Sequence, residues 1–229
     1  QLKFKEAMVH LKSAVKLQPT YSEAHNNLGN ALSGLNRFRE ANIYYQEAIR
    51  LNPNYPEAHN NLANSLSKKL RLDEAIIHYK KAIQLKPEYS EAHFNFGVTL
   101  NKWNRSEQAI GYLEEAIRLN PNFTKARLSL GNILRLKYEF KTAIHHFKTI
   151  IKVNPNHAIA HNSLGSALAE QGNFEQAIDH FHTSITINPR YLEAHQNLGT
   201  IFLILGQPEQ SVVHFKIAKE IAMNEKLKQ

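Results

Sequence analysis

The chain has 229 residues, a formal net charge of +8 and no cysteine, which excludes a disulfide framework and thiol chemistry. Its longest apolar run, residues 201–205, is much shorter than the ~18 residues that a membrane-spanning helix needs, and no signal peptide is recognisable. We therefore expect no membrane partner and a cytoplasmic location.

A unit of 34 residues recurs along the chain. Its prolines follow one another at this spacing: Pro19, Pro53, Pro87, Pro121, Pro155 and Pro189. Most are followed by an Ala-His pair: Ala24-His25, Ala58-His59, Ala92-His93, Ala160-His161 and Ala194-His195, with Ala126-Arg127 in the fourth copy. A small residue comes next at a constant distance: Gly29, Ala63, Gly97, Gly131, Gly165 and Gly199. One supersecondary unit therefore repeats, and function has to be sought in what varies between the copies.

The N-terminal segment matches only the second half of this unit. Phe4, Ala7, Leu11 and Ala14 are in phase with the later second helices, but the first helix that should precede them is missing. The chain also does not begin with methionine. We predict a fragment of a longer protein, whose first helix exposes apolar surface on one side.

Each full unit is predicted to contain two helices. The first copy has two apolar stripes at helical spacing: Ala24, Leu28, Ala31, Leu32 and Leu35, then Phe38, Ala41, Tyr45, Ala48 and Ile49. Asn36-Arg37 is expected to form the turn between the two helices. Asn52-Pro53 should end the second helix, because proline disfavours helical geometry in the residue before it. Gly29 should let the two helices approach closely.

The last copy departs from the pattern at two positions. Ser211 replaces the usual alanine and Met223 replaces the usual proline. We expect its second helix to continue through residues 224–228 as a polar, solvated cap.

The unit resembles the tetratricopeptide repeat (TPR), a helix-turn-helix family of the same period. The matching residues of the first full copy are Leu28-Gly29, Ala41, Tyr45, Ala48 and Pro53. The sequence departs from the family pattern where His25 takes the place of its tryptophan and Leu32 the place of its tyrosine.

This resemblance implies an all-α fold, a right-handed α-solenoid (superhelix) of helix-turn-helix units. We predict a single solenoid over residues 1–229, because each unit packs only on its neighbours. The expected divisions are 1–21 for the second helix of a truncated repeat, 22–55, 56–89, 90–123, 124–157 and 158–191 for full repeats, and 192–229 for the last repeat with its helical extension.

The resemblance also implies that the first helices line an inner, concave groove. The inward positions of the first copy would be Glu23, Asn26, Asn27, Asn30, Ser33 and Gly34, which form one stripe of a helix. Asparagine recurs on this stripe although it is a poorer helix former than alanine by roughly half a kcal/mol. A side-chain amide offers a donor and an acceptor, which match the C=O and N–H of a peptide backbone. A row of such amides would hold an extended chain without reading its sequence.

The asparagine row is similar to the peptide-binding ladder of O-linked N-acetylglucosamine transferases. The corresponding positions are Asn27, Asn61, Asn95, Ser129, Ser163 and Asn197. The two serines break the row, so clamping of a peptide backbone is in doubt in the fourth and fifth copies. The alternative is that the asparagines serve only hydrogen bonds between helices, and the sequence leaves both interpretations open.

Apolar side chains interrupt the polar stripe in the later copies: Phe94, Val98, Leu128, Leu136, Leu203 and Ile204. They predict either pockets for partner side chains or ordinary burial between repeats. Lys102, Lys125 and Arg135 would favour an acidic or phosphorylated ligand. The predicted peptide-binding residues are Asn26, Asn27, Asn30, Asn60, Asn61, Asn64, Phe94, Asn95, Lys125, Leu128, Asn132, Arg135 and Asn197.

Other kinds of site find little support. A clamp for chaperone C-termini would need basic residues at Asn26 and Asn95 or their equivalents. Those positions hold Asn, Phe, Leu, Gln or Ser, so we expect no such clamp. The histidines of the Ala-His pairs fall at the family's aromatic packing position, so we predict packing groups and no metal or other cofactor. No phosphate-binding loop, nucleophile elbow or metalloprotease motif is present, so we predict no enzymatic activity in this chain. The positive charges are scattered among acidic neighbours, which argues against nucleic acid.

The sequence thus predicts a protein–protein interaction scaffold whose groove binds an extended, possibly acidic segment of a partner or substrate protein. One alternative is a structural module that self-associates through its outer face or its exposed end helices. Another is the substrate-recruiting part of a larger glycosyl- or sulfotransferase.

Overall fold

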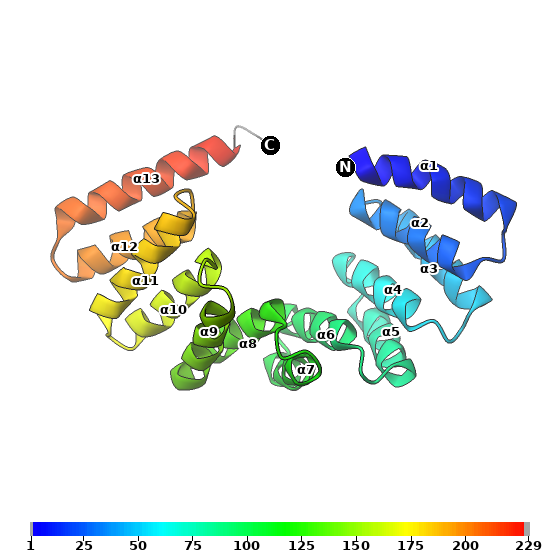
Figure 1. The fold of residues 1–229 in the computed structure, drawn as a ribbon, viewed down its shortest axis with the longest axis horizontal. Coiled ribbons are helices and arrows are strands. Elements are labelled where there is room, and N and C mark those ends of the chain that lie inside the picture. Colours follow the sequence, from blue (N-terminus) through cyan, green and yellow to red (C-terminus); the bar gives the residue numbers. More distant parts are fainter. Residues whose placement is uncertain (1, 227–229) are drawn as a thin grey trace. The chain divides into compact units, whose positions relative to one another are not determined.

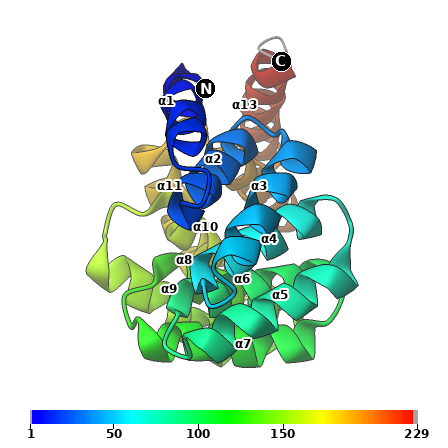
Figure 2. The same cartoon turned by 90° about the vertical axis from the view of Figure 1, so that its right-hand side faces the viewer.

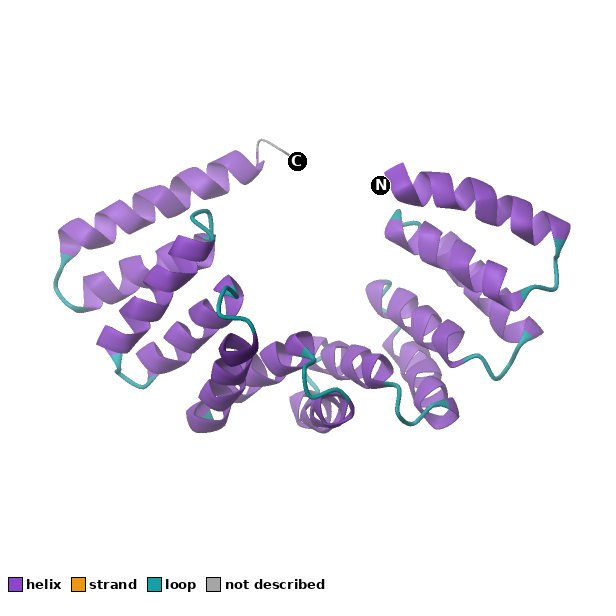
Figure 3. Cartoon of the chain, in the orientation of Figure 1, coloured by secondary structure: helices purple, strands orange, loops and turns teal. Residues whose placement is uncertain are grey.

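The computed structural model describes residues 2–226, which form thirteen helices and no strand (Figures 1 and 3). Short loops connect the helices (Figure 3). This is the helical repeat solenoid that the 34-residue period predicts. The parts of the predictions that concern Gln1, Leu227 and Lys228 lie outside the described residues. The chain forms two compact units, Gln1–Pro121 and Asn122–Gln229.

The first unit contains an N-terminal helix and three helix pairs. Its helices are α1 (Leu2–Leu17), α2 (Ser22–Gly34), α3 (Phe38–Leu51), α4 (Pro56–Lys68), α5 (Leu72–Leu85), α6 (Ser90–Lys102) and α7 (Ser106–Leu119). The paired helices α2 and α3, α4 and α5, and α6 and α7 pack on one another, and α1 packs on α2 (Figures 1 and 2). We call α2, α4 and α6 the first helices of their pairs.

The second unit contains three further pairs. Its helices are α8 (Thr124–Leu136), α9 (Phe140–Val153), α10 (Ala158–Glu170), α11 (Phe174–Ile187), α12 (Leu192–Ile204) and α13 (Pro208–Lys226). The first helices here are α8, α10 and α12. Successive first helices also contact each other, α10 with α8 and with α12.

The turn within each pair contains one residue with a left-handed backbone. These residues are Asn36, Leu70, Asn104, Tyr138, Gly172 and Gly206, with φ between 58° and 81°. The following N–H closes the turn, as where Arg37 N donates to Leu32 O at 2.9 Å. Leu70 and Tyr138 adopt this conformation despite their Cβ atoms, which costs roughly 1–2 kcal/mol at each position.

The repeated Ala-His pairs and prolines are joined by a hydrogen bond. The five histidines are 3–7% exposed. Nε2 of each lies 2.8–3.2 Å from the carbonyl oxygen of the proline six residues earlier. Because a carbonyl only accepts, this nitrogen carries the proton and donates. The histidines therefore hold five of the inter-repeat loops against the first helix that follows each loop, which is a packing role.

Three of these histidines also meet a histidine of the second helix. The two Nδ1 atoms are 3.0 Å apart in His59–His78, 3.1 Å in His161–His180 and 3.2 Å in His195–His214. Ring centroids 5.3–5.4 Å apart put both nitrogens close to the line between the rings, as an N–H···N bond requires. Since Nε2 of the first histidine donates to proline, its Nδ1 accepts and the second histidine donates. One proton fits between the Nδ1 atoms and a second does not.

In five of the pairs the small residue of the first helix is a glycine that lies against a ring or branched side chain of the second helix. A Cβ added at Gly29 would lie 2.5 Å from Cε1 of Tyr45, and Tyr45 is only 2% exposed. By contrast, a Cβ at Gly111 on α7 would meet nothing within 4 Å. The two glycines therefore differ in packing although both lie within helices.

We predict that Gly29→Leu lowers the free energy of unfolding by about 1–3 kcal/mol, because it overpacks the α2–α3 contact. Gly111→Leu should raise it by up to ~1 kcal/mol, since leucine favours helix more than glycine does. Urea unfolding followed by circular dichroism measures both. Equal effects of the two substitutions would contradict close packing at Gly29.

We also predict that acidification destabilises the histidine pairs. Burial lowers the pKa of His59, His78, His180 and His214 below the ordinary value, and the paired histidine lowers that of the last three further. The charged or titratable neighbours are Lys81 beside His59, Glu74 beside His78, Lys148 and Asp179 beside His180, and His182 beside His214. The unfolded state then binds more protons, so stability is complete above about pH 6.5 and is lost as the pH falls below it.

The measurement is the thermal midpoint between pH 8 and pH 5. The control is His78→Tyr/His180→Tyr/His214→Tyr, which installs the tyrosine that the first and third copies carry at Tyr44 and Tyr112. The variant should lose part of the pH slope. His146, whose pKa burial lowers to about 4, is present in both proteins, so the difference between the slopes reports the pairs. Identical slopes would show that the pairs do not respond to protons.

Candidate functional site

Asparagine side chains connect consecutive first helices in the first unit. Nδ2 of Asn61 on α4 donates to Oδ1 of Asn26 on α2 at 3.0 Å. Nδ2 of Asn95 on α6 donates to Oδ1 of Asn60 on α4 at 3.2 Å. The accepting residues are buried, Asn26 at 4% and Asn60 at 1% exposed. These bonds satisfy buried carbonyl oxygens, so they hold successive repeats together.

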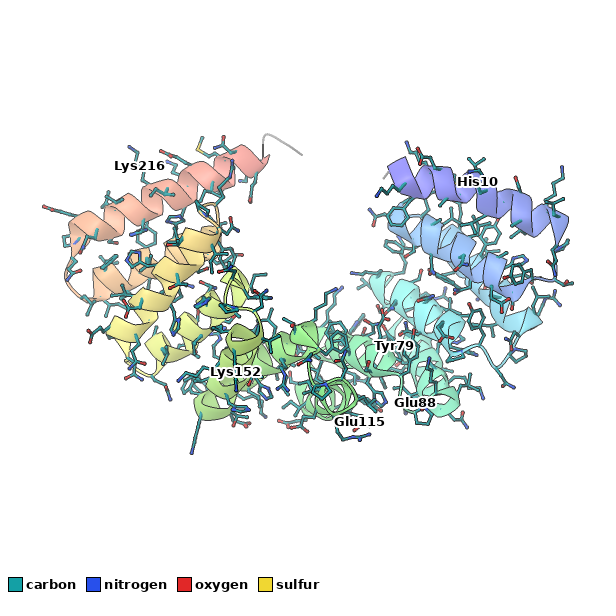
Figure 4. The ribbon with its side chains drawn as sticks, viewed as in Figure 1. His10, Tyr79, Glu88, Glu115, Lys152 and Lys216 are labelled. Carbon is teal, nitrogen blue, oxygen red and sulfur yellow. The ribbon has the colours of Figure 1, made fainter. Side chains whose placement is uncertain are left out.

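Tyrosine hydroxyls extend this polar network. Asn26 Nδ2 donates to the hydroxyl of Tyr55 at 3.4 Å. The hydroxyl of Tyr45 donates to Asn30 Oδ1 at 2.9 Å, and that of Tyr79 donates to Asn64 Oδ1 at 2.6 Å. Burial raises the pKa of Tyr45 and of Tyr79 to about 12, so both keep the proton that they donate. Tyr79, labelled in Figure 4, thus serves both the core and the asparagine stripe.

The network does not use all the hydrogen-bonding groups of these amides. A side-chain amide has two N–H groups and an oxygen with two lone pairs. The inter-repeat bond occupies one N–H of Asn61 and one of Asn95. Asn27 is exposed, and its side chain makes no hydrogen bond within residues 2–226. The remaining groups are chemically suited to bind the backbone of another chain.

The second unit repeats the arrangement once. Nδ2 of Asn197 on α12 donates to Oδ1 of Asn162 on α10 at 2.9 Å and lies 3.3 Å from Ser166 Oγ. Asn162 is 8% exposed. Asn132 is half-buried, and the serines that interrupt the row are half-buried at Ser129 and buried at Ser163.

A pocket of ≈ 460 Å³ adjoins this asparagine pair. It is lined by Arg135, Asn162, Ser166, Ala169, Glu170, Phe174, Phe181, Glu193, Gln196, Asn197, Thr200, Ile201 and Ile204. Most of these residues stand 34 residues or a multiple of 34 after an inward position of the first copy. We call this cavity, which α8, α10, α11 and α12 form, the α12 pocket.

The charges around the α12 pocket are partly paired. Arg135, which is 21% exposed, donates from Nη1 to Oε1 of Glu170. Glu193 in the first turn of α12 is exposed. Lys125 is exposed on α8 and does not line the pocket. Of the three cations predicted to attract an acidic ligand, Arg135 is therefore engaged by a carboxylate, Lys125 lies outside the pocket, and Lys102 lies on α6 in the first unit.

The predicted apolar site residues fall in different units. Phe94 lies on α6 of the first unit and Leu128 on α8 of the second, and both are half-buried. Sequence reasoning named neither Glu170, Glu193 nor Thr200 as site residues. Applying the inward stripe of the first copy to the last two copies would have found all three.

Residues 2–226 contain neither a metal-binding cluster nor a membrane-spanning helix. No group of three or more His, Asp or Glu side chains there is arranged to bind a metal ion. None of the described helices has the length and apolar character needed to cross a membrane.

We predict that Asn61→Ala and Asn27→Ala differ in stability. Asn61→Ala leaves the buried Oδ1 of Asn26 without its donor, which should cost about 1–3 kcal/mol. Asn27→Ala removes no such bond and should change the free energy of unfolding little. Urea unfolding of both variants measures the difference. If Asn61→Ala were as stable as Asn27→Ala, the inter-repeat bond would not support the fold.

The sequence and the fold are similar to those of known proteins. The tetratricopeptide repeat family matches residues 22–55, 56–89, 78–111 and 158–191, together more than half of the chain. No curated protein matches the chain. Many solved structures share the fold.

One is the crystal structure of YrrB, described as a TPR protein with an unusual peptide-binding site. Its sequence is 26% identical to this chain, and the two structures match with a TM-score of 0.65 over 80% of this chain and 95% of YrrB. The crystal structure of MamA is also 26% identical with a TM-score of 0.65, covering 73% of this chain and 98% of MamA. PilF of Pseudomonas aeruginosa, 15% identical with a TM-score of 0.76 over 91% of this chain and 97% of its own, shows the fold alone. The chain belongs to the tetratricopeptide repeat family.

Proposed function

We propose that this protein is an interaction scaffold. It holds an extended segment of a partner protein against the row of asparagines on successive first helices. The observation that supports this most is the inter-repeat asparagine bond, seen at Asn61, Asn95 and Asn197. It fixes each amide in one orientation and uses only part of its hydrogen-bonding capacity. An amide already ordered by the fold loses little side-chain entropy when it binds a ligand.

The two interpretations of the asparagines are therefore compatible. One N–H of each amide holds the neighbouring repeat, and the other groups remain for a peptide backbone. Each such bond contributes about 0.5–1.5 kcal/mol net, so several amides in a row are needed for useful affinity. Of the thirteen residues predicted from the sequence, the buried Asn26 and Asn60 would orient the binding amides, and the other eleven are the proposed binding residues, with the α12 pocket as a place for partner side chains.

We also propose that the repeats divide as the sequence predicts, at 22–55, 56–89, 90–123, 124–157 and 158–191, within one solenoid. The likeness of the asparagine row to that of O-linked N-acetylglucosamine transferases suggests that the scaffold recruits substrates for a catalytic domain elsewhere in a longer protein. The peptide-binding site described for YrrB supports the broader idea of peptide recognition.

Binding to a library of random extended peptides tests the proposal. Asn27→Ala/Asn61→Ala/Asn95→Ala should weaken binding by at least about tenfold if three backbone bonds are lost. Because Asn61→Ala and Asn95→Ala also disturb the fold, Asn27→Ala alone is the matched variant. It should weaken binding by about two- to tenfold with unchanged circular dichroism. Undiminished binding by both variants would refute the clamp.

A second candidate function is self-association, which apolar side chains on the end helices favour. On α1, Val9 is 61% and Leu17 86% exposed, and on α13 Val212 is 65% and Met223 57% exposed. Mass measured by light scattering over a range of concentrations distinguishes the two functions. Dimers that form equally well in wild type and in the asparagine variants would favour self-association.

A further inference from the structure

Resting on the proposed function, we infer that the α12 pocket selects partner segments in which a lysine or arginine is followed or preceded, a few residues away, by an aliphatic residue. The pocket combines an acidic end, an amide pair and an apolar end.

The acidic end is Glu193. The ionisable residues that line the pocket are Arg135, Glu170 and Glu193, so carboxylates outnumber guanidinium groups there. Arg135 already donates to Glu170, and an acidic ligand would have to displace that carboxylate. A cation can approach the exposed Glu193 without breaking any bond between residues 122 and 226 that the structure shows. The local balance favours a basic side chain, the reverse of the acidic ligand expected from Lys102, Lys125 and Arg135.

This acidic lining stands out in a chain of net charge +8. Charges farther away than a Debye length of about 8 Å are largely screened at physiological salt. Because Arg135 offsets the charge of Glu170, the unpaired carboxylate of Glu193 dominates the potential that a bound side chain experiences in the pocket.

The apolar end is formed by the C-terminal part of α12 and the start of α11. Ile204 lines the pocket and is 61% exposed, so it has apolar surface to cover. Ile201 and Phe174 line the same cavity. An aliphatic partner residue placed here would remove apolar surface from water on both sides.

The distance between the two ends sets the spacing of the partner residues. Glu193 and Ile204 are eleven positions apart on α12, or about 16 Å at 1.5 Å per residue. A segment that contacts both ends runs parallel to α12 within the pocket and so turns from the direction of the asparagine row, which crosses successive first helices. An extended chain in that orientation advances about 3.3 Å per residue, so the basic and aliphatic residues should be about five positions apart, or fewer when a long side chain reaches out. Asn197 lies between the two ends on the same helix, where its amide can meet the backbone of the segment.

The charge test uses wild type, Glu193→Gln and Glu91→Gln. Glu91 occupies the same position in the repeat, 102 residues earlier, with Lys68 and Lys102 where the pocket has Glu170 and Ile204. Affinities are measured by fluorescence anisotropy for a peptide with Lys and Leu five positions apart and for matched peptides with Gln or Glu in place of Lys. Wild type and Glu91→Gln should prefer the Lys peptide over the Gln peptide by about two- to fivefold, and Glu193→Gln should lose that preference.

The apolar test compares two adjacent residues, Leu203 and Ile204. Ile204 and Leu203 are each 61% exposed, but only Ile204 lines the pocket. Ile204→Ser should weaken binding of the Leu peptide several-fold, and Leu203→Ser should leave it unchanged. Equal effects of the two substitutions would overturn the apolar end.

The outcomes separate this inference from the proposed function. Binding of all three peptides with equal affinity, or a preference for Glu that survives Glu193→Gln, would overturn the inference while leaving the scaffold intact. Binding of none of the peptides by wild type, together with no binding to the random library, would overturn both.

Discussion

Hydrogen bonds between asparagine side chains 35 residues apart join successive first helices. They are found in the pairs Asn26–Asn61, Asn60–Asn95 and Asn162–Asn197. The acceptor of each lies on a residue that is at most 8% exposed. A buried carbonyl oxygen without a donor is unfavourable by about 1–3 kcal/mol, so the packing of successive repeats depends on the donor. The donor amide meanwhile stands at the edge of the same interface, where part of it remains accessible. In the proposed function, the same side chain therefore supports the scaffold and binds the partner.

The network is interrupted where the sequence changes. Phe94 and Leu128 occupy the position of the accepting asparagines, and serine replaces the donor at Ser129 and Ser163. These copies lose the amide pair and gain apolar side chains. A solenoid tolerates such changes because each repeat contacts only its neighbours. Variation between copies can then give one part of the stripe a general affinity for backbone and another part, such as the α12 pocket, a preference for particular side chains.

Periodicity predicted much of this structure. The 34-residue spacing indicated helix pairs, and the turn at Asn36 and the buried position of Tyr45 followed from the apolar stripes. The pairing of His59 with His78 and the ion pair of Arg135 with Glu170 did not follow. Both depend on which side chains face one another across helices, and a single helical stripe does not contain that information. The position of Glu193 in the pocket could have been predicted, because Glu193 corresponds to the inward residue Glu23 of the first copy. It was not named because the asparagines dominate the inward stripe of the first two copies.

The most direct test of the account is to observe the asparagine side-chain amides by nuclear magnetic resonance while an extended peptide is added. We predict that the NH₂ signals of Asn61, Asn95 and Asn197 shift on binding, and that in the free protein one proton of each already exchanges slowly because it is bonded to the preceding repeat. Unchanged NH₂ signals, with shifts confined to backbone amides of the second helices α3, α5 and α11, would place the partner elsewhere and leave the asparagines as scaffold alone.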